Sequence, residues 1–269
     1  MGGVLRLQKN NLNLPEESFR LQIKDLAEEV RIKFARKGLS DIFDILSEAA
    51  FLIRKPLDTD ELSGFSTYFE GQFIVYLNSN FTLGHERYTG AHELYHLIYN
   101  ADILKKEKIL LNDEKHKEED AKADVFASEF LMPEDYVKEV FYKIVNVDKN
   151  SILPRHIIRM HNYFKVSYKA MLKRLIQLNL CSIDKYEELV DICSLENTEL
   201  LQSLTIREGY SIDLITPSKE TYVSKEYIEF IKTNYERGNI SYKNMKNSLE
   251  FIGLAPEQFG YEYPQEEDY

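Results

Sequence analysis

The stretch RYTGAHELYHLIYN, residues 87–100, constrains the fold of this chain more than any other part of the sequence. His92 and His96 are four residues apart, so on a helix their side chains lie on one face with Cβ atoms about 5–6 Å apart. Most residues around them are apolar, among them Leu94 and Leu97, which predicts a buried helix. Because buried polar side chains need partners, the two histidines are expected to share one.

Two interpretations fit this histidine pair. In the first, both imidazoles bind one zinc ion, since zinc–nitrogen bonds of about 2.0–2.1 Å are compatible with the helical spacing. Glu93 then lies close enough to act on a water at that ion, which is the HExxH arrangement of metallopeptidases, with two ligands and a general base. In the second, both are ordinary helix histidines, because HExxH also occurs by chance. The correctly placed glutamate and the apolar surroundings favour the metal site.

A catalytic zinc usually has a third protein ligand, and the candidates lie downstream. The segment KEEDAKADVFASEFLMP, residues 117–133, is rich in carboxylates and continues into apolar residues. Asp120 and Asp124 are again four residues apart, so one can bind the ion while the other accepts the free N–H of a ligand histidine. The alternative is that these carboxylates form the solvated face of an ordinary helix.

Charge and composition limit the classes of function. The 269-residue chain has a formal net charge of −11, which opposes binding to phosphate backbones. The two cysteines, Cys181 and Cys193, show no metal-binding spacing and favour a reduced protein. The first residues lack the apolar core of a signal peptide, and no apolar run is long enough to span a bilayer. We therefore expect a cytoplasmic protein that binds neither nucleic acid nor membrane.

Periodicity along the chain predicts an α+β fold that is mostly helical. Residues 51–57 and 63–79 are typical of β-strands, and the second segment is expected to form two strands around Glu70–Gly71. These strands predict a small antiparallel sheet next to the histidine helix, which is expected to span residues 84–100.

Helices are expected before and after this sheet. An amphipathic helix precedes Gly38, and an α-hairpin ends near residue 180, with Ser167 as the cap of its second helix. We therefore predict three parts, namely an N-terminal helical extension at residues 1–38, a central domain at residues 39–180 and a C-terminal helical region of unknown role at residues 181–269.

Three blocks together resemble the ImmA/IrrE family of metallopeptidases. They are RYTGAHELYHL at residues 87–97, DAKADVFASEFLMP at residues 120–133 and FKVSYKAMLKRLIQLNL at residues 164–180. They occur in the order of the family's pattern with compatible spacing, which is far more specific than HExxH alone. The resemblance covers roughly residues 40–180 and implies a zincin-like minimal metallopeptidase core in the central domain.

The resemblance also implies roles for individual residues. His92 and His96 are expected to bind zinc, with Glu93 as the general base. Asp120 occupies the position of the third ligand, where the family usually has Glu, and the adjacent Glu119 can compete for this role. Asp124 is expected to accept a hydrogen bond from a ligand histidine.

Two functions follow from these expectations. The resemblance implies a zinc endopeptidase whose protein substrate is a helix-turn-helix repressor of a mobile element, prophage or stress regulon. The alternative is a non-catalytic, metal-binding regulator that binds a repressor or a toxin–antitoxin partner, which Asp120 in place of Glu favours.

Peptide binding and oxyanion stabilisation are less constrained by the sequence. The strand FIVYLNS, residues 73–79, precedes the histidine helix and is expected to bind an extended peptide by strand addition. The donor that stabilises the oxyanion is left open among His156, His161, Tyr95, Tyr99 and Tyr163. His85 is interpreted as a helix-start residue, and His116 as a solvated one.

Overall fold

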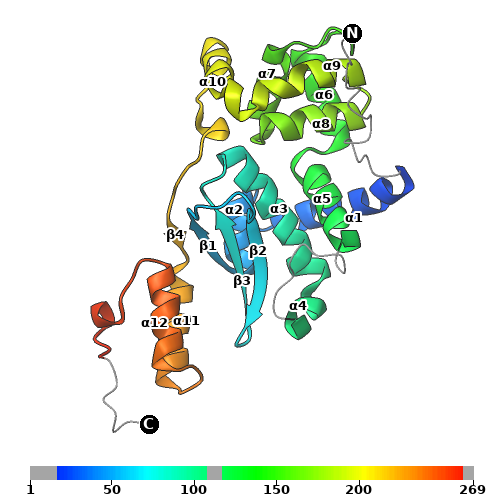
Figure 1. The fold of residues 1–269 in the computed structure, drawn as a ribbon. Helices are drawn as coiled ribbons and strands as arrows, with labels where there is room; N and C mark the ends of the chain where they lie inside the picture. The colour runs from blue at the N-terminus through cyan, green and yellow to red at the C-terminus, as the bar shows by residue number, and fades with distance from the viewer. Residues whose placement is uncertain (1–16, 108–116, 263–269) are drawn as a thin grey trace, which may run out of the picture.

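A four-stranded sheet lies between helices at the centre of the molecule (Figure 1). The structure, a computed structural model, describes residues 17–107 and 117–262. The strand order is β2-β3-β1-β4, and the strands are β1 (Phe51–Lys55), β2 (Gly64–Phe69), β3 (Gln72–Asn78) and β4 (Tyr222–Val223). The predicted α+β fold with a small sheet is confirmed.

The sheet is mixed, and the prediction that it is antiparallel throughout is wrong. β2 and β3 form the expected antiparallel hairpin, in which Glu70 (φ 45°) and Gly71 (φ 88°) adopt the positive φ that a two-residue type I′ turn requires. β1, however, runs parallel to β3 and pairs Leu52 with Val75. The reason is that the connection after β1 places β2 two strand positions away from β1, and the hairpin then brings β3 back into the position between them.

β3 is the central strand and organises both layers of helices. It is paired with β2 on one side and with β1 on the other, so the predicted addition of a peptide strand to residues 73–79 is wrong. Its side chains alternate between the two faces. Val75 and Leu77 belong to the apolar core beneath the histidine helix, whereas Ile74 and Tyr76 pack against the C-terminal helices.

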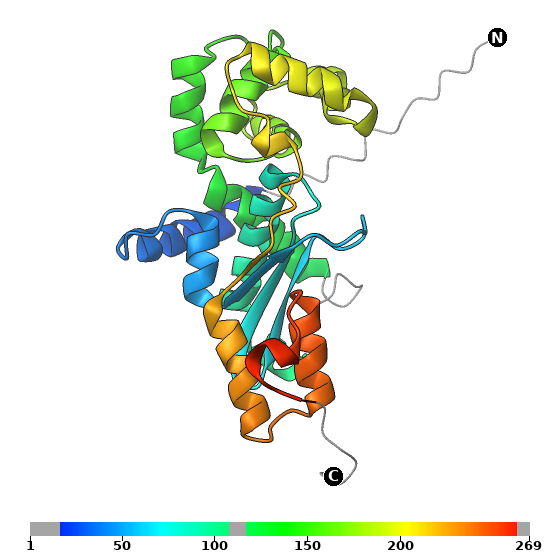
Figure 2. The ribbon, with the colours of Figure 1, turned by 90° about the vertical axis from the view of Figure 1, so that its left-hand side faces the viewer.

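Helices cover both faces of the sheet, and a further helical group lies beyond one end of it (Figures 1 and 2). Figure 2 shows the C-terminal pair, in orange and red, beside the strands. The described α-helices are α1 (Glu17–Ala35), α2 (Ile42–Ala49), α3 (Leu83–Tyr99), α4 (Ala101–Glu107), α5 (Lys117–Leu131), α6 (Glu134–Ile144), α7 (Pro154–Phe164), α8 (Tyr168–Gln177), α9 (Ile183–Val190), α10 (Thr198–Arg207), α11 (Lys225–Glu236) and α12 (Tyr242–Phe251).

α3 is the predicted histidine helix, and it packs closely against the loop between α7 and α8. A Cβ atom at Gly84 would lie 2.6 Å from the backbone nitrogen of Ser167, so only glycine permits this approach. Ser167 caps α8 as predicted, because its hydroxyl accepts a hydrogen bond of 3.1 Å from the backbone N–H of Ala170. The first turn of α8 is thereby fixed beside the first turn of α3.

A buried ion cluster fixes α5 relative to its neighbours. Glu129 of α5 accepts hydrogen bonds from Arg174 of α8 at 2.5 and 2.9 Å and from Arg20 of α1 at 2.7 Å. Removal of one member of such a cluster leaves an uncompensated buried charge, which is strongly destabilising. α5 and α8, which line the same cleft as α3, are therefore held in a defined arrangement.

None of the described helices combines the length and the apolar composition that a membrane span requires. The predicted part boundaries at residues 38 and 180 stay a prediction. α1 packs in one apolar core with α2, α3 and α5, while α6 to α10 share a second core.

Candidate metal centre

The structure brings His92, His96 and Asp120 together at one point. His92 and His96 lie one turn apart on α3, with their Nε2 atoms 3.1 Å from each other. Asp120 comes from the first turn of α5, and its Oδ1 lies 3.4 Å from Nε2 of His96 and 3.9 Å from Nε2 of His92. Donor atoms around a tetrahedral zinc ion with bonds of about 2.0–2.1 Å are roughly 3.3 Å apart. The three atoms therefore have the separation that one such ion needs.

The outer nitrogen of each imidazole is engaged by a side-chain oxygen. Nδ1 of His92 lies 3.0 Å from Oδ1 of Asp124, and Nδ1 of His96 lies 2.9 Å from Oδ1 of Asn100. A carboxylate and an amide oxygen only accept hydrogen bonds, so both Nδ1 atoms donate. The two Nε2 atoms face each other, and in the neutral form of each ring Nε2 carries a lone pair.

The donor set fits a divalent cation. Two neutral imidazoles in this arrangement repel unless a proton or a metal ion lies between their Nε2 atoms, and Oδ2 of Asp120 is buried without a hydrogen-bond partner in the described structure. This is the one group of three or more metal-ligating side chains found among residues 17–107 and 117–262. A metal ion would satisfy all three side chains at once.

The charges around His92 favour its positive form when no metal is present. Burial by itself lowers the pKa of His92, but the hydrogen bond to Asp124 and the charges of Glu93 and Asp120 outweigh burial and raise this pKa above its ordinary value. The environment of His92 thus stabilises a positive charge at this ring.

Glu93 lies beside the triad and is held by the sheet. Its side chain is largely buried, with a residue exposure of 6%, and its Oε2 accepts a hydrogen bond of 2.7 Å from the Ser66 hydroxyl on β2. Ser66 is itself 1% exposed. The carboxylate of the predicted general base therefore has a fixed orientation, with Oε2 engaged and Oε1 left for other partners.

An open cleft of about 620 Å³ gives access to these residues. It lies between the loop that enters β2 and the helices α3, α5 and α8. All the predicted site residues line it, namely His92, Glu93, His96, Asp120 and Asp124. The wall contributed by α8 carries Lys169 and Lys173, so the cleft has an acidic side and a basic side.

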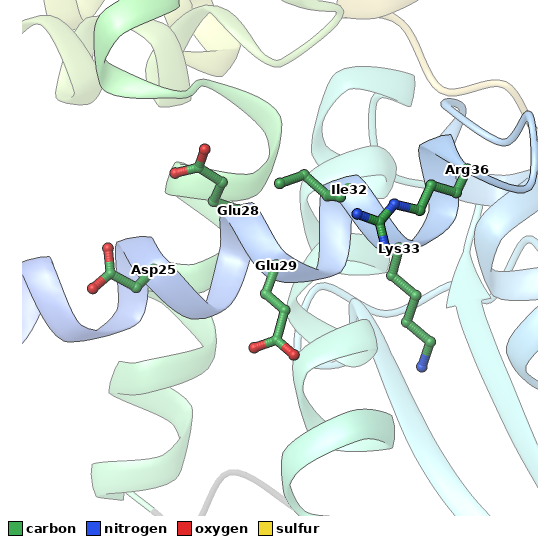
Figure 3. A pocket seen from close by; sticks show the side chains of 6 residues that line it. All are labelled: Asp25, Glu28, Glu29, Ile32, Lys33 and Arg36. Atoms are coloured by element: carbon green, nitrogen blue, oxygen red, sulfur yellow. The ribbon is translucent and has the colours of Figure 1, made fainter.

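A second hollow lies on α1 and holds none of the predicted site residues (Figure 3). The six side chains that line it all come from this helix, and Figure 3 shows Glu28 and Glu29 pointing to opposite sides. Its carboxylates do not converge as those of a metal site do, so the cleft at α3 is the candidate active site.

Glu119, the rival third ligand, lies in a different network. Its Oε2 accepts hydrogen bonds from Asn100 at 2.7 Å and from Tyr95 at 3.3 Å, and its Oε1 accepts one of 2.7 Å from Lys122. Burial raises the pKa of Glu119, but the hydrogen bonds from Lys122 and Asn100 outweigh burial, so the net shift is downward. Asp120, not Glu119, faces the two histidines.

The sequence interpretation missed Ser66, Asn100 and Lys122. Asn100 follows His96 by one helical turn, and this spacing is a local signal for a hydrogen bond. Lys122 likewise lies three residues after Glu119. Ser66 has no such signal, because it reaches Glu93 only through the packing of β2 on α3.

The proposed oxyanion donors do not lie in the cleft. His156, His161, Tyr95, Tyr99 and Tyr163 are all absent from its described lining. His85 of α3 does line it, with Nε2 2.9 Å from the Ser63 hydroxyl. Burial, followed by the charge of Lys169, lowers the pKa of His85, so this ring is neutral at pH 7. His116 lies outside the described residues.

The fold and the site together define a metallopeptidase-type domain, in which a histidine pair and a carboxylate meet beside a glutamate in an open cleft. Residues 48–176 match the Peptidase_M78 family model, the IrrE N-terminal-like domain, so this part of the chain is similar to that family. The resemblance to the ImmA/IrrE family is thereby confirmed. A search of curated proteins found no match to the chain.

Proposed function

We propose that the chain is a zinc-dependent endopeptidase, with His92, His96 and Asp120 as metal ligands and Glu93 as general base. The observation that carries this proposal is the convergence of two imidazole nitrogens and one carboxylate, with Oδ2 of that carboxylate buried and unpartnered, in the open cleft that Glu93 also lines. Two nitrogen ligands and one carboxylate are a usual donor set of catalytic zinc, with a further position left for water or substrate.

The residues of the chain divide the chemistry between them. A divalent ion held by the triad supplies Lewis acidity toward a carbonyl oxygen and toward a water. Glu93 accepts the proton of the attacking water at Oε1, because Oε2 is engaged by Ser66. The same carboxyl group then delivers this proton to the nitrogen of the departing amine, so that the peptide bond breaks without a free amide anion.

The proposed substrate is a protein, namely a helix-turn-helix repressor of a mobile element, prophage or stress regulon. The family resemblance supports this substrate. A cytoplasmic location belongs to the same proposal, because a repressor of transcription acts there.

The test uses the full chain and a helix-turn-helix repressor encoded beside its gene. We expect about one zinc per chain by elemental analysis, cleavage of the repressor by the native protein, and loss of cleavage on chelation. Glu93→Gln should retain zinc and lose cleavage by at least about a hundredfold, since a general base contributes about 10²–10⁴-fold.

The alternative function is a metal-binding regulator. A native protein that binds zinc and associates with the repressor, but cleaves neither this repressor nor a mixture of unfolded proteins, would establish the regulator instead. Equal affinity of the native chain and of Glu93→Gln for the repressor would further support the regulator, because Glu93 would then have no effect on binding.

A further inference from the structure

We infer that Glu119 is a positioning residue for the metal ligand His96, acting through Asn100, and that it is not a ligand itself. The inference rests on the proposed metal site but not on its peptidase activity. It concerns which nitrogen of His96 carries the proton.

The network behind His96 is continuous, and its inner part, at His96 and Asn100, is buried. Nδ1 of His96 lies 2.9 Å from Oδ1 of Asn100, and Nδ2 of Asn100 donates to Oε2 of Glu119 at 2.7 Å. His96 and Asn100 are each 3% exposed, so water offers little competition for these bonds. Glu119 is anchored in turn by Lys122, whose Nζ lies 2.7 Å from Oε1.

The carboxylate determines the orientation of the Asn100 amide. Glu119 is an acceptor only, so Asn100 must present its NH₂ group to it and its oxygen to His96. His96 must then donate from Nδ1, and its Nε2 carries the lone pair that faces His92 and Asp120. The reversed amide would place two acceptors together at Glu119 and would require a proton on Nε2, which points into the metal site.

Asp124 has the corresponding role at His92, but by direct contact. Its Oδ1 accepts from Nδ1 of His92 at 3.0 Å. Each ligand histidine is thus oriented by one carboxylate, one directly and one through an amide. Partners of this kind are worth about 10–100-fold in metal affinity.

The experiment measures zinc affinity of the full chain by competition with a chromophoric chelator at pH 7. Glu119→Gln keeps the size of the side chain but lets position 119 donate as well as accept. The amide of Asn100 is then no longer held in one orientation, and we expect the zinc dissociation constant to rise at least about tenfold.

Glu118→Gln is the matched control. Its side chain is 80% exposed and also pairs with Lys122, at 2.9 Å, so the substitution removes the same charge from the same lysine and leaves in place the hydrogen bonds that join Glu119, Asn100 and His96. We expect a change below about twofold. Thermal unfolding of both variants without metal separates a loss of affinity from a loss of fold.

Two further readouts distinguish positioning from a structural role. Nitrogen NMR of the metal-free chain should show His96 protonated at Nδ1 in the native protein and a mixture of tautomers in Glu119→Gln. The double substitution Asn100→Asp with Glu119→Gln should restore zinc affinity, because the new carboxylate at position 100 accepts directly from Nδ1 of His96.

Equal zinc affinity of Glu119→Gln and Glu118→Gln overturns the inference. So does complete loss of zinc from Glu119→Gln with retention by Asp120→Asn, since Glu119 would then be the ligand. A chain that behaves as expected here but cleaves no protein leaves the inference intact and contradicts the proposed peptidase.

Discussion

The hydroxyl of Ser66 orients the predicted general base. It donates to Oε2 of Glu93 at 2.7 Å from a residue that is almost fully buried on β2. Hydrogen bonds to charged groups contribute about 1.5–3 kcal/mol, and one made to a reacting carboxylate also limits its positions.

Ser66→Ala is therefore expected to lower kcat for a cleaved substrate roughly tenfold or more, since about 1.4 kcal/mol of barrier corresponds to that factor. KM and the zinc content should change little, because Ser66 touches neither the triad nor the open part of the cleft. Ser66→Thr keeps the hydroxyl and is expected to retain most of the rate. An unchanged kcat in Ser66→Ala would mean that Glu93 is positioned by the helix alone.

His161 is buried in its neutral form between α7 and α8. Its Nδ1 lies 3.1 Å from the carbonyl oxygen of Val166, and Nδ2 of Asn162 lies 3.2 Å from its Nε2. Burial lowers the pKa of His161 to about 4, and the hydrogen bond to the carbonyl offsets only part of this. The unfolded chain binds the proton at a higher pH than the folded chain does.

The free energy of unfolding should therefore fall as pH decreases from about 6.5 to about 4, by up to about 3 kcal/mol from this group. The sign follows because the unfolded state binds more protons across this window. This pH dependence is checked by measuring the free energy of unfolding in urea at several pH values, for the native chain and for His161→Gln. The difference in free energy of unfolding between the two proteins should change with pH. A constant difference would show that His161 does not cause the pH dependence.

The wall formed by α8 is the basic side of the cleft. Lys169 and Lys173 lie one turn apart on it, line the cleft and form no ion pair with a described residue. The same cleft is lined by the carboxylates of Glu93, Asp120 and Asp124. A peptide with an acidic residue beside its scissile bond would place this residue near the lysines.

Lys169→Glu with Lys173→Glu is expected to reduce kcat/KM for such peptides at least about tenfold and to favour basic residues at the same position, because the wall changes sign. Lys225→Glu with Lys243→Glu makes the same change of net charge at exposed positions outside the cleft. The cleavage profile of a mixed peptide library, measured for each double variant, reports the change in rate and the change in residue preference. Identical profiles for the two double variants would show that α8 does not select the substrate.

Local signals in the sequence are sufficient to predict single helices and hairpins. The spacing of His92 and His96 predicted α3, and Glu70–Gly71 predicted the hairpin of β2 and β3. The parallel pairing of β1 with β3 and the pairing of β1 with β4 depend on where long connections lead the chain, and no local pattern encodes that. Ser66 was missed for the same reason, whereas Asn100 was missed although its spacing from His96 is a local signal.

At the scale of the whole molecule, the C-terminal region completes the sheet. Residues 216–223 run beside the start of α3, where Glu220 pairs with Arg54 at 2.8 Å and Leu83 donates its backbone N–H to Thr216. α11 and α12 then cover Ile53, Ile74 and Tyr76, which lie on the face of the sheet opposite α3. The cleft at α3 and this second layer therefore lie on the same sheet.

A chain that ends after residue 215 is expected to expose this apolar face, to bind a hydrophobic dye and to aggregate, because large exposed apolar patches promote association. Met245→Ala tests the same layer without truncation. Met245 is fully buried, so its loss should lower the free energy of unfolding by about 2–5 kcal/mol, whereas Asn244→Ala at the exposed neighbouring position should change it by less than about 0.5 kcal/mol. Denaturant unfolding measures both. A truncated chain that stays monomeric and binds zinc with native affinity would show that the strands and the cleft are stable without the C-terminal layer, whose role would then lie outside the fold of the metal centre.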